Sequence, residues 1–194
     1  MARWVVGMTG ASGAIYGVRL LQALHARHDT EVELVVSQAA SLTLAHETPH
    51  TVPELAALAT HVHDEKNIGA TIASGSYRRD GMVVAPCSIK TMSCIAHSLS
   101  LNLIHRAADV TLKERKPLIL LVRETPLHAG HLESMLALSR LGAVIVPAAP
   151  SFYHQPRSVD DLVDGLVTRL LDLMGLPRPD AKRWAGLTPP PESR

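Results

Sequence analysis

The sequence predicts a three-layer α/β domain, in which a mostly parallel sheet carries helices on both faces. Short β-rich apolar runs alternate along the chain with longer segments whose apolar residues recur at helical spacing. Each run holds four to six apolar residues, as is typical of parallel strands that are buried on both faces. The 194 residues are enough for one such domain and too few for two.

Five runs predict strands and seven segments predict helices. The strands are expected at Arg3–Met8, Glu31–Ser37, Gly81–Ser88, Pro117–Glu124 and Ala143–Pro150. The helices are expected at Ala14–Arg27, Ala39–Glu47, Pro53–Val62, Ser88–His97, His105–Arg115, His131–Gly142 and Ser158–Gly175. Ser158 is a suitable N-cap for the last helix, and Gly175 is a suitable stop. We therefore expect a single Rossmann-like domain over residues 1–175.

Composition indicates which partners to expect. Hydrophobic residues make up 46% of the chain but aromatic residues only 3%, so the core has to be aliphatic. Because so short a chain has little interior, we expect part of its apolar surface to be buried in a homo-oligomer. The net charge of +1, with both signs evenly spread, predicts no nucleic-acid partner. No apolar run has the length of a membrane span.

The two ends of the chain and its cysteines complete this picture. Glycines from Gly7 to Gly13 interrupt the first apolar run, so we expect no signal peptide. Cys87 and Cys94 are too few for a disulfide framework, and we expect a cytoplasmic protein. Residues 176–194 are rich in proline and polar side chains and are interpreted as a tail. Its Trp184 is predicted to pack on a neighbouring subunit.

Hydroxyl and charged side chains come directly after the expected strands. In open α/β sheets ligands bind outside the carboxyl ends of the strands, so these side chains are candidates for one shared site. They are Thr9, Ser12, Ser37, Ser88, Lys90, Thr91, Arg123, Glu124 and Ser151–His154.

The stretch "MTGASGAIYG", Met8–Gly17, connects the first strand to the first helix. It lacks the lysine with which a Walker loop grips a triphosphate. A dinucleotide site needs an acid after the second strand, and Ser37 stands there instead. The loop therefore predicts a seat for one phosphate, such as that of FMN, rather than for ATP or NAD. The plain alternative is that its glycines only turn the chain.

Other polar groups give weaker signals. Cys87 is most simply a small buried hydrophobe. His128 and His131 have no obvious further ligand, and we expect no metal site. Arg106 and Lys113 lie seven residues apart on one helix face, which fits either a solvated basic face or a second anion site.

Long motifs carry a resemblance to a known family. They are "MTGASGAIYGVRLL", "APCSIKTMS", "HRAADVTLKERKPLILLVRETPLH", "HLESMLALSRLGAVIVPAAPSFYHQP" and "SVDDLVDGLVTRLLD". Together, over about residues 3–186, they closely resemble the UbiX/Pad1 family of flavin prenyltransferases, whose members were formerly named as one of the subunits of phenolic-acid or hydroxyaryl-acid decarboxylases. In fold this family resembles flavin-containing cysteine decarboxylases, so the resemblance implies the flavoprotein form of the α/β fold.

The resemblance also implies an activity. The family joins a dimethylallyl group from dimethylallyl phosphate to N5 and C6 of reduced FMN, and hands the prenylated FMN to a UbiD-type decarboxylase. The implied assembly is typically a dodecamer. FMN contacts are implied at Gly10, Ala11, Ser12, Ser37, Ser88, Ile89, Lys90, Thr91 and Arg123. Contacts with dimethylallyl phosphate are implied at Arg106, Lys113, Tyr153 and Arg169. Catalytic roles are implied for Ser12, Glu47, Lys113, Glu124 and Trp184.

Two alternative functions stay open at this point. One is an FMN-dependent cysteine decarboxylase, and the other is a non-catalytic flavin-carrier subunit of an aromatic-acid decarboxylase. The three cations Arg106, Lys113 and Arg169 favour a small phosphate substrate over a peptide. Some family members have Thr at the position of Ile89 and a small residue at that of Lys90. Backbone contacts with the flavin survive this difference, and a side-chain contact at that position does not. Both ubiquinone biosynthesis and aromatic-acid breakdown remain open as the pathway.

Overall fold

The computed structural model describes residues 1–184 and 186. One six-stranded parallel sheet runs through the molecule in the order β3-β2-β1-β4-β5-β6. The strands are β1 (Ala2–Met8), β2 (Thr30–Val36), β3 (His61–His63), β4 (Gly81–Cys87), β5 (Leu118–Val122) and β6 (Val144–Pro147). The connections diverge between β1 and β4, which is the Rossmann-like arrangement. The predicted fold class is confirmed.

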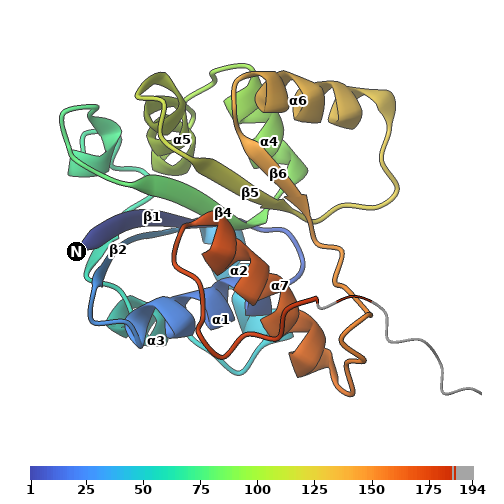
Figure 1. The fold of residues 1–194 in the computed structure, drawn as a ribbon. Helices are drawn as coiled ribbons and strands as arrows, with labels where there is room; N and C mark the ends of the chain where they lie inside the picture. The colour runs from blue at the N-terminus through green and yellow to red at the C-terminus, as the bar shows by residue number, and fades with distance from the viewer. Residues whose placement is uncertain (185, 187–194) are drawn as a thin grey trace, which may run out of the picture.

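Helices cover both faces of the sheet (Figure 1). One face carries α1 (Ala14–His25), α2 (Gln38–Glu47), α3 (Val52–Ala57) and α7 (Val159–Leu173). The other face carries α4 (Ile89–Ala96), α5 (Leu103–Lys113), α6 (Ala129–Arg140) and the short 3-10 turn Thr71–Ala73. Ser158 caps α7 as predicted, because its hydroxyl accepts from the N–H of Asp161 at 3.1 Å.

Aliphatic side chains of alternate strand residues fill two cores, one on each face of the sheet. In β1, Val6 packs under α1 and α7, while Val5 packs under α5 on the other face. Helix α1 lies close to the sheet at Gly17, where an added Cβ would stand 2.5 Å from the carbonyl oxygen of Ala85. This close contact places the N-terminus of α1 beside the carboxyl ends of β1 and β4.

The helix predicted over Pro53–Val62 is wrong in its second half. Helix α3 ends at Ala57, and His61–His63 forms the edge strand β3 instead. The backbone of this segment pairs with β2, and the buried carboxylate of Glu33 on β2 contacts His63 Nε2 at 2.7 Å. Pairing with a distant strand overrides the local helical pattern. A strand of three residues is too short to show a strand pattern in the sequence.

The opposite edge of the sheet is apolar on its surface. Leu132 and Leu136 of α6 are 53% and 51% exposed, and Val144 of the edge strand β6 is 37% exposed. No helix in the described residues is long and apolar enough to span a membrane. Of the predicted tail, residues 185 and 187–194 lie outside the described residues.

Candidate active site

The loop after β1 holds a carboxylate at the place where its sequence predicts a phosphate. The N–H groups of Gly13 and Ala14, at the start of α1, donate to Glu47 Oε2 at 2.8 and 2.9 Å. Gly13 has a φ of 98°, a conformation that suits glycine, and this turns the two N–H groups toward the end of α2. The helix N-terminus therefore already holds one negative charge.

Glu47 is part of a polar cluster that three segments build. Burial acts to raise the pKa of Glu47, but hydrogen bonds from Ser12 and from the Ala14 and Gly13 N–H groups, with the charge of Arg123, outweigh burial and lower it. Burial raises the pKa of Tyr16, and the same Arg123 charge opposes this rise. Glu47 is therefore ionised at neutral pH, next to Ser12 and within reach of the Arg123 charge.

The carboxyl ends of β1 and β4 are joined by Thr9. Its hydroxyl donates to the carbonyl of Pro86 at 2.8 Å and accepts from the N–H of Ser88 at 2.8 Å. Ser88 in turn caps α4, because its hydroxyl accepts from the N–H of Thr91 at 3.3 Å. Ser37 caps α2 in the same way, accepting from Ala40 at 3.1 Å.

The N-termini of α1, α2 and α4 meet at this edge, and they differ in what they hold. Helix α1 holds Glu47, and the first N–H of α2, that of Gln38, donates to Glu65 at 2.7 Å. In the described residues, the N–H groups of Ile89 and Lys90 on α4 donate to no oxygen. Helix α4 therefore offers donors that a bound anion can use.

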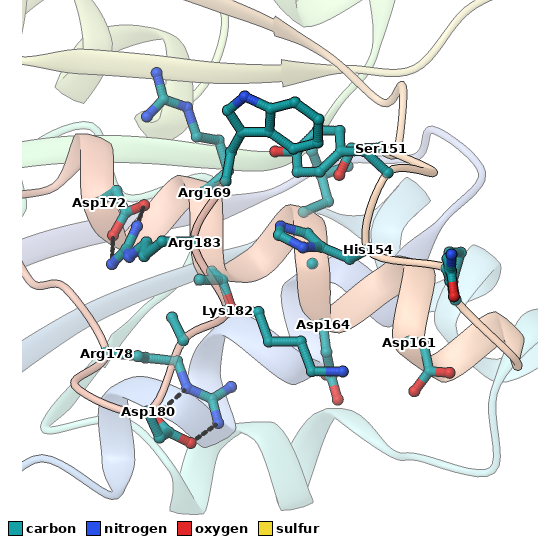
Figure 2. A pocket seen from close by; sticks show the side chains of 18 of the residues that line it. Ser151, His154, Asp161, Asp164, Arg169, Asp172, Arg178, Asp180, Lys182 and Arg183 are labelled. Atoms are coloured by element: carbon teal, nitrogen blue, oxygen red, sulfur yellow. Dashed lines mark hydrogen bonds and ion pairs between the residues drawn. The ribbon is translucent and has the colours of Figure 1, made fainter. Parts of the chain in front are cut away.

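A separate cavity of about 970 Å³ opens between α7, the segment after β6 and the end of the described chain (Figure 2). Tyr153, Arg169 and Trp184 line it. The rings of Tyr153 and Trp184 meet edge to face with centroids 5.2 Å apart. The structure thus brings together two of the four residues expected to contact dimethylallyl phosphate and one of those expected in catalysis.

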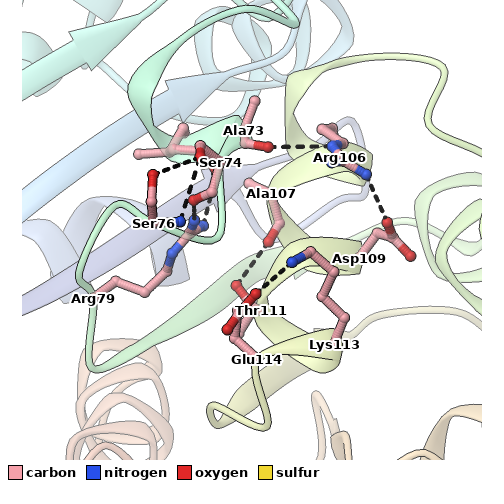
Figure 3. Close-up of polar contacts among 11 residues, drawn as sticks. Ala73, Ser74, Ser76, Arg79, Arg106, Ala107, Asp109, Thr111, Lys113 and Glu114 are labelled. Atoms are coloured by element: carbon pink, nitrogen blue, oxygen red, sulfur yellow. Dashed lines mark hydrogen bonds and ion pairs between the residues drawn. The ribbon is translucent and has the colours of Figure 1, made fainter.

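Arg106 and Lys113 lie elsewhere in the same chain (Figure 3). Arg106 Nε donates to the carbonyl of Ala73 at 3.2 Å, and Nη1 pairs with Asp109 at 3.0 Å. Lys113 pairs with Glu114 at the C-terminal end of α5. Because β5 starts shortly after this end, Lys113 lies toward the amino ends of the strands, opposite the edge that carries Ser12. Neither cation lines the cavity.

Comparison with known proteins places the chain in a family. The sequence profile of the Flavoprotein family matches residues 1–171. The "Flavin prenyltransferase UbiX" of Escherichia coli K12 is 53% identical over 188 residues, which cover 96% of this chain and 100% of that protein. The chain belongs to the UbiX family of flavin prenyltransferases. The UbiX protein of Thauera aromatica is 52% identical over 184 residues, 95% of this chain and 94% of that protein.

Solved structures of the UbiX family share the fold. The dodecameric FMN-dependent UbiX-like decarboxylase of Escherichia coli O157:H7 superposes with a TM-score of 0.93 at 50% identity, covering 95% of this chain and all of that one. AnUbiX (PadA1), solved with FMN and dimethylallyl pyrophosphate, superposes with a TM-score of 0.94 at 46% identity, covering 96% and 99%.

The remaining candidate residues of this UbiX-family chain have simple surroundings. Glu124 is exposed and accepts from the N–H of Thr125 at 3.0 Å. Cys87 is fully buried, and burial raises the pKa of its thiol, so it is the inert hydrophobe that the sequence predicted. The rings of His128 and His131 stack with centroids 3.5 Å apart. The described part of the chain holds no group of three or more ligands suited to a metal ion.

The sequence predicts Thr9 as a site candidate but does not show its role. Its bridge between two strands depends on tertiary contact. Glu65 and Asp172 were not predicted to take part. For Asp172 a signal was present, because it lies three residues after Arg169 and therefore on the same helix face.

Proposed function

We propose that this chain joins the dimethylallyl group of dimethylallyl phosphate to N5 and C6 of reduced FMN. The observation that carries the proposal is the cluster of Ser12, Glu47 and Arg123 beside the open N-terminus of α4. The 53% identity to a flavin prenyltransferase supports the reaction type.

FMN fits the carboxyl edge of the sheet with its phosphate on α4. There the N–H groups of Ile89 and Lys90 and the hydroxyls of Ser88 and Thr91 provide donors for a dianion. Glu47 makes the N-terminus of α1 unsuitable for a second anion, so the phosphate seat moves from the glycine loop to α4. The loop residues Gly10–Ser12, with Ser37 and Arg123, then border the flavin. Reduced FMN supplies a nucleophilic N5 there.

The cavity beside α7 suits the prenyl donor. Arg169 and Tyr153 bind the phosphate and stabilise the charge that develops as it leaves, which is often the largest catalytic contribution. The ring face of Trp184 steadies the allyl cation. This placement supports the three residues as a donor site.

A second copy of the chain completes the donor site. Arg106 and Lys113 lie away from Tyr153 and Arg169 within one chain, so they reach the phosphate only from a neighbouring copy. The dodecameric UbiX-like structure of Escherichia coli O157:H7 supports assembly of this kind. Trp184 contacts Tyr153 of its own chain and is 54% exposed, so its free side can also pack on a neighbour. This packing of the tail and a dodecamer for this chain are part of the same proposal.

Two carboxylates have distinct roles in the proposal. Glu47, held ionised, orients Ser12 toward the flavin N5. The bond from N5 to the prenyl group forms as the bond from carbon to phosphate breaks, and the N5 proton leaves with the phosphate. Ring closure then joins C6 to one carbon of the prenyl double bond while the other carbon takes up a proton, and Glu124 or the departed phosphate accepts the proton that C6 loses. The product, prenylated FMN, passes to a UbiD-type decarboxylase. A cytoplasmic location stays a prediction.

A direct assay tests the proposal. The protein is incubated without oxygen with reduced FMN and dimethylallyl phosphate, and the flavin is analysed by mass spectrometry. We expect a flavin heavier by one C5H8 unit. A protein that binds FMN but forms no such adduct would be a flavin carrier or a decarboxylase, and the prenyltransferase function would be excluded. Parallel incubation with the diphosphate identifies the preferred donor.

A further inference from the structure

The described end of the chain turns back along α7 and is held there by an ion pair. Arg183 grips the carboxylate of Asp172 with both terminal nitrogens, and Nη2 lies 2.8 Å from Oδ1 (Figure 2). The Asp172 side chain is 15% exposed, while that of Arg183 is 52% exposed. A bidentate ion pair of this geometry fixes the direction of the chain as well as its position.

Trp184 follows directly on this anchor. Its ring packs edge to face on Tyr153 with centroids 5.2 Å apart, at the mouth of the same cavity. A tail residue without an anchor would lose much of this contact to chain entropy. The pair of Arg183 with Asp172 therefore determines where the Trp184 ring lies.

The same pair determines what Arg169 can bind. Arg169 and Asp172 are three residues apart on α7, the spacing at which opposite charges pair on a helix. In the described residues Arg169 nevertheless forms no ion pair, and Arg183 contacts both oxygens of Asp172. Figure 2 shows the Arg169 side chain directed away from that pair. The charge of Arg169 still contributes, after that of Arg183, to the lowered pKa of Asp172, so the two residues are close.

We propose that Arg183 is a positioning residue: by occupying Asp172 it leaves Arg169 free for the phosphate of the prenyl donor and holds Trp184 at the cavity. The inference rests on the function proposed above, in which Arg169 binds that phosphate. Neither Arg183 nor Asp172 touches the substrate in this scheme.

Two substitutions separate the two effects. Arg183→Ala releases the tail and also frees Asp172 to pair with Arg169. Asp172→Asn releases the tail but leaves Arg169 unpaired. We therefore expect kcat to fall in both variants, while KM for dimethylallyl phosphate rises about tenfold in Arg183→Ala only. The double variant should have the KM of Asp172→Asn alone, because the competing carboxylate is gone.

Matched controls come from the same segment. Arg178→Ala removes an arginine that pairs with Asp180 at 3.2 Å rather than with Asp172. Because Arg178 also lines the cavity, this variant is a control for the position of the tail and not for KM. Arg183→Lys keeps a charge near Asp172, so its KM should lie between that of Arg183→Ala and that of the wild type. If Arg183 had a purely structural role, the double variant would keep the raised KM of Arg183→Ala.

Tryptophan fluorescence tests the anchor without any turnover. The chain has two tryptophans, and Trp4 is only 2% exposed, so acrylamide quenches Trp184. We expect stronger quenching in Arg183→Ala and Asp172→Asn and no change in Arg178→Ala. Equal quenching in all variants would overturn the anchoring part of the inference.

The kinetic outcomes distinguish the inference from the function on which it rests. If Arg169→Ala leaves KM for dimethylallyl phosphate unchanged, the proposed phosphate site is wrong. If Arg169→Ala raises KM but Arg183→Ala does not, or if the double variant keeps the high KM of Arg183→Ala, the positioning role of Arg183 is overturned.

Discussion

Glu47 Oε2 accepts the N–H of Gly13 at 2.8 Å, so the last residue of α2 closes the first turn of α1. The carboxylate lies at the positive end of the helix dipole, and its pKa is lowered there despite partial burial. Two segments that are 34 residues apart are thus connected by a charge that must stay ionised.

Glu47→Gln should make stability less dependent on pH. Because folding lowers the pKa of Glu47 below its unfolded value of about 4.3, its contribution is present above that pH and is lost as the pH falls through the folded pKa. We expect the variant to lose about 0.5–1 kcal/mol of unfolding free energy at pH 7. Urea denaturation at pH 7 and near pH 3 should show the difference only at the higher pH. A difference of equal size at both would contradict a charge effect.

Mixing two variants with impaired turnover should restore activity. Lys113→Ala and Arg169→Ala damage residues that different copies bring to one site, so a randomly mixed oligomer contains about one intact site in four. We expect turnover near that fraction after co-expression. Mixing Lys113→Ala with Arg106→Ala is the control, because both come from the same copy and no intact site forms. Equal recovery in the two mixtures would show that the site is not shared in this way.

Gly10→Ala should destabilise the protein and weaken FMN binding. An added Cβ would lie 2.6 Å from Ala39 Cβ and 3.2 Å from the Ala39 carbonyl carbon, so α2 would have to move. We expect a loss of about 1–3 kcal/mol in thermal or urea unfolding. Gly165→Ala is the contrast: it lies in α7 with nothing within 4 Å of the new Cβ, and should gain about 0.5–1 kcal/mol.

Cys87→Ala should leave turnover within about twofold of the wild type. The thiol is fully buried and burial raises its pKa, so almost no thiolate forms at neutral pH. Removal of the sulfur leaves a small cavity and should cost about 1 kcal/mol of stability. Iodoacetamide should label Cys87 only in denaturant, and loss of turnover in a folded variant would show a chemical role for the thiol.

The order of the main strands and helices was predictable because each is long enough to show its period. The strand at Ala2–Met8 and the helix at Val159–Leu173 begin and end within about two residues of the sequence prediction. The strand at His61–His63 could not be predicted, because three residues carry no pattern and its partner β2 lies far away in the sequence. Local signals therefore fail where a short element depends on a distant one.

The candidate site also has features that the sequence predicts and features that depend on tertiary contacts. Parallel topology brings the polar residues after the strands to one edge of the sheet, so their meeting there was predictable. Ser12, Ser37 and Ser88 lie at that edge as expected. Which helix N-terminus stays open was not predictable, because Glu47 and Glu65 reach α1 and α2 through tertiary contacts. The separation of Arg106 from Arg169 was likewise hidden, since helical spacing says nothing about which end of the sheet a helix face meets.

Because of the apolar surface around α6 and β6, the stability of this chain should depend on its concentration. Leu132, Leu136 and Val144 stay in water in a single copy, beside the open hydrogen-bonding edge of β6. Any association that covers them binds the folded form and not the unfolded one. The midpoint of thermal unfolding should therefore rise with protein concentration, and dilution alone should shorten the lifetime of the folded state.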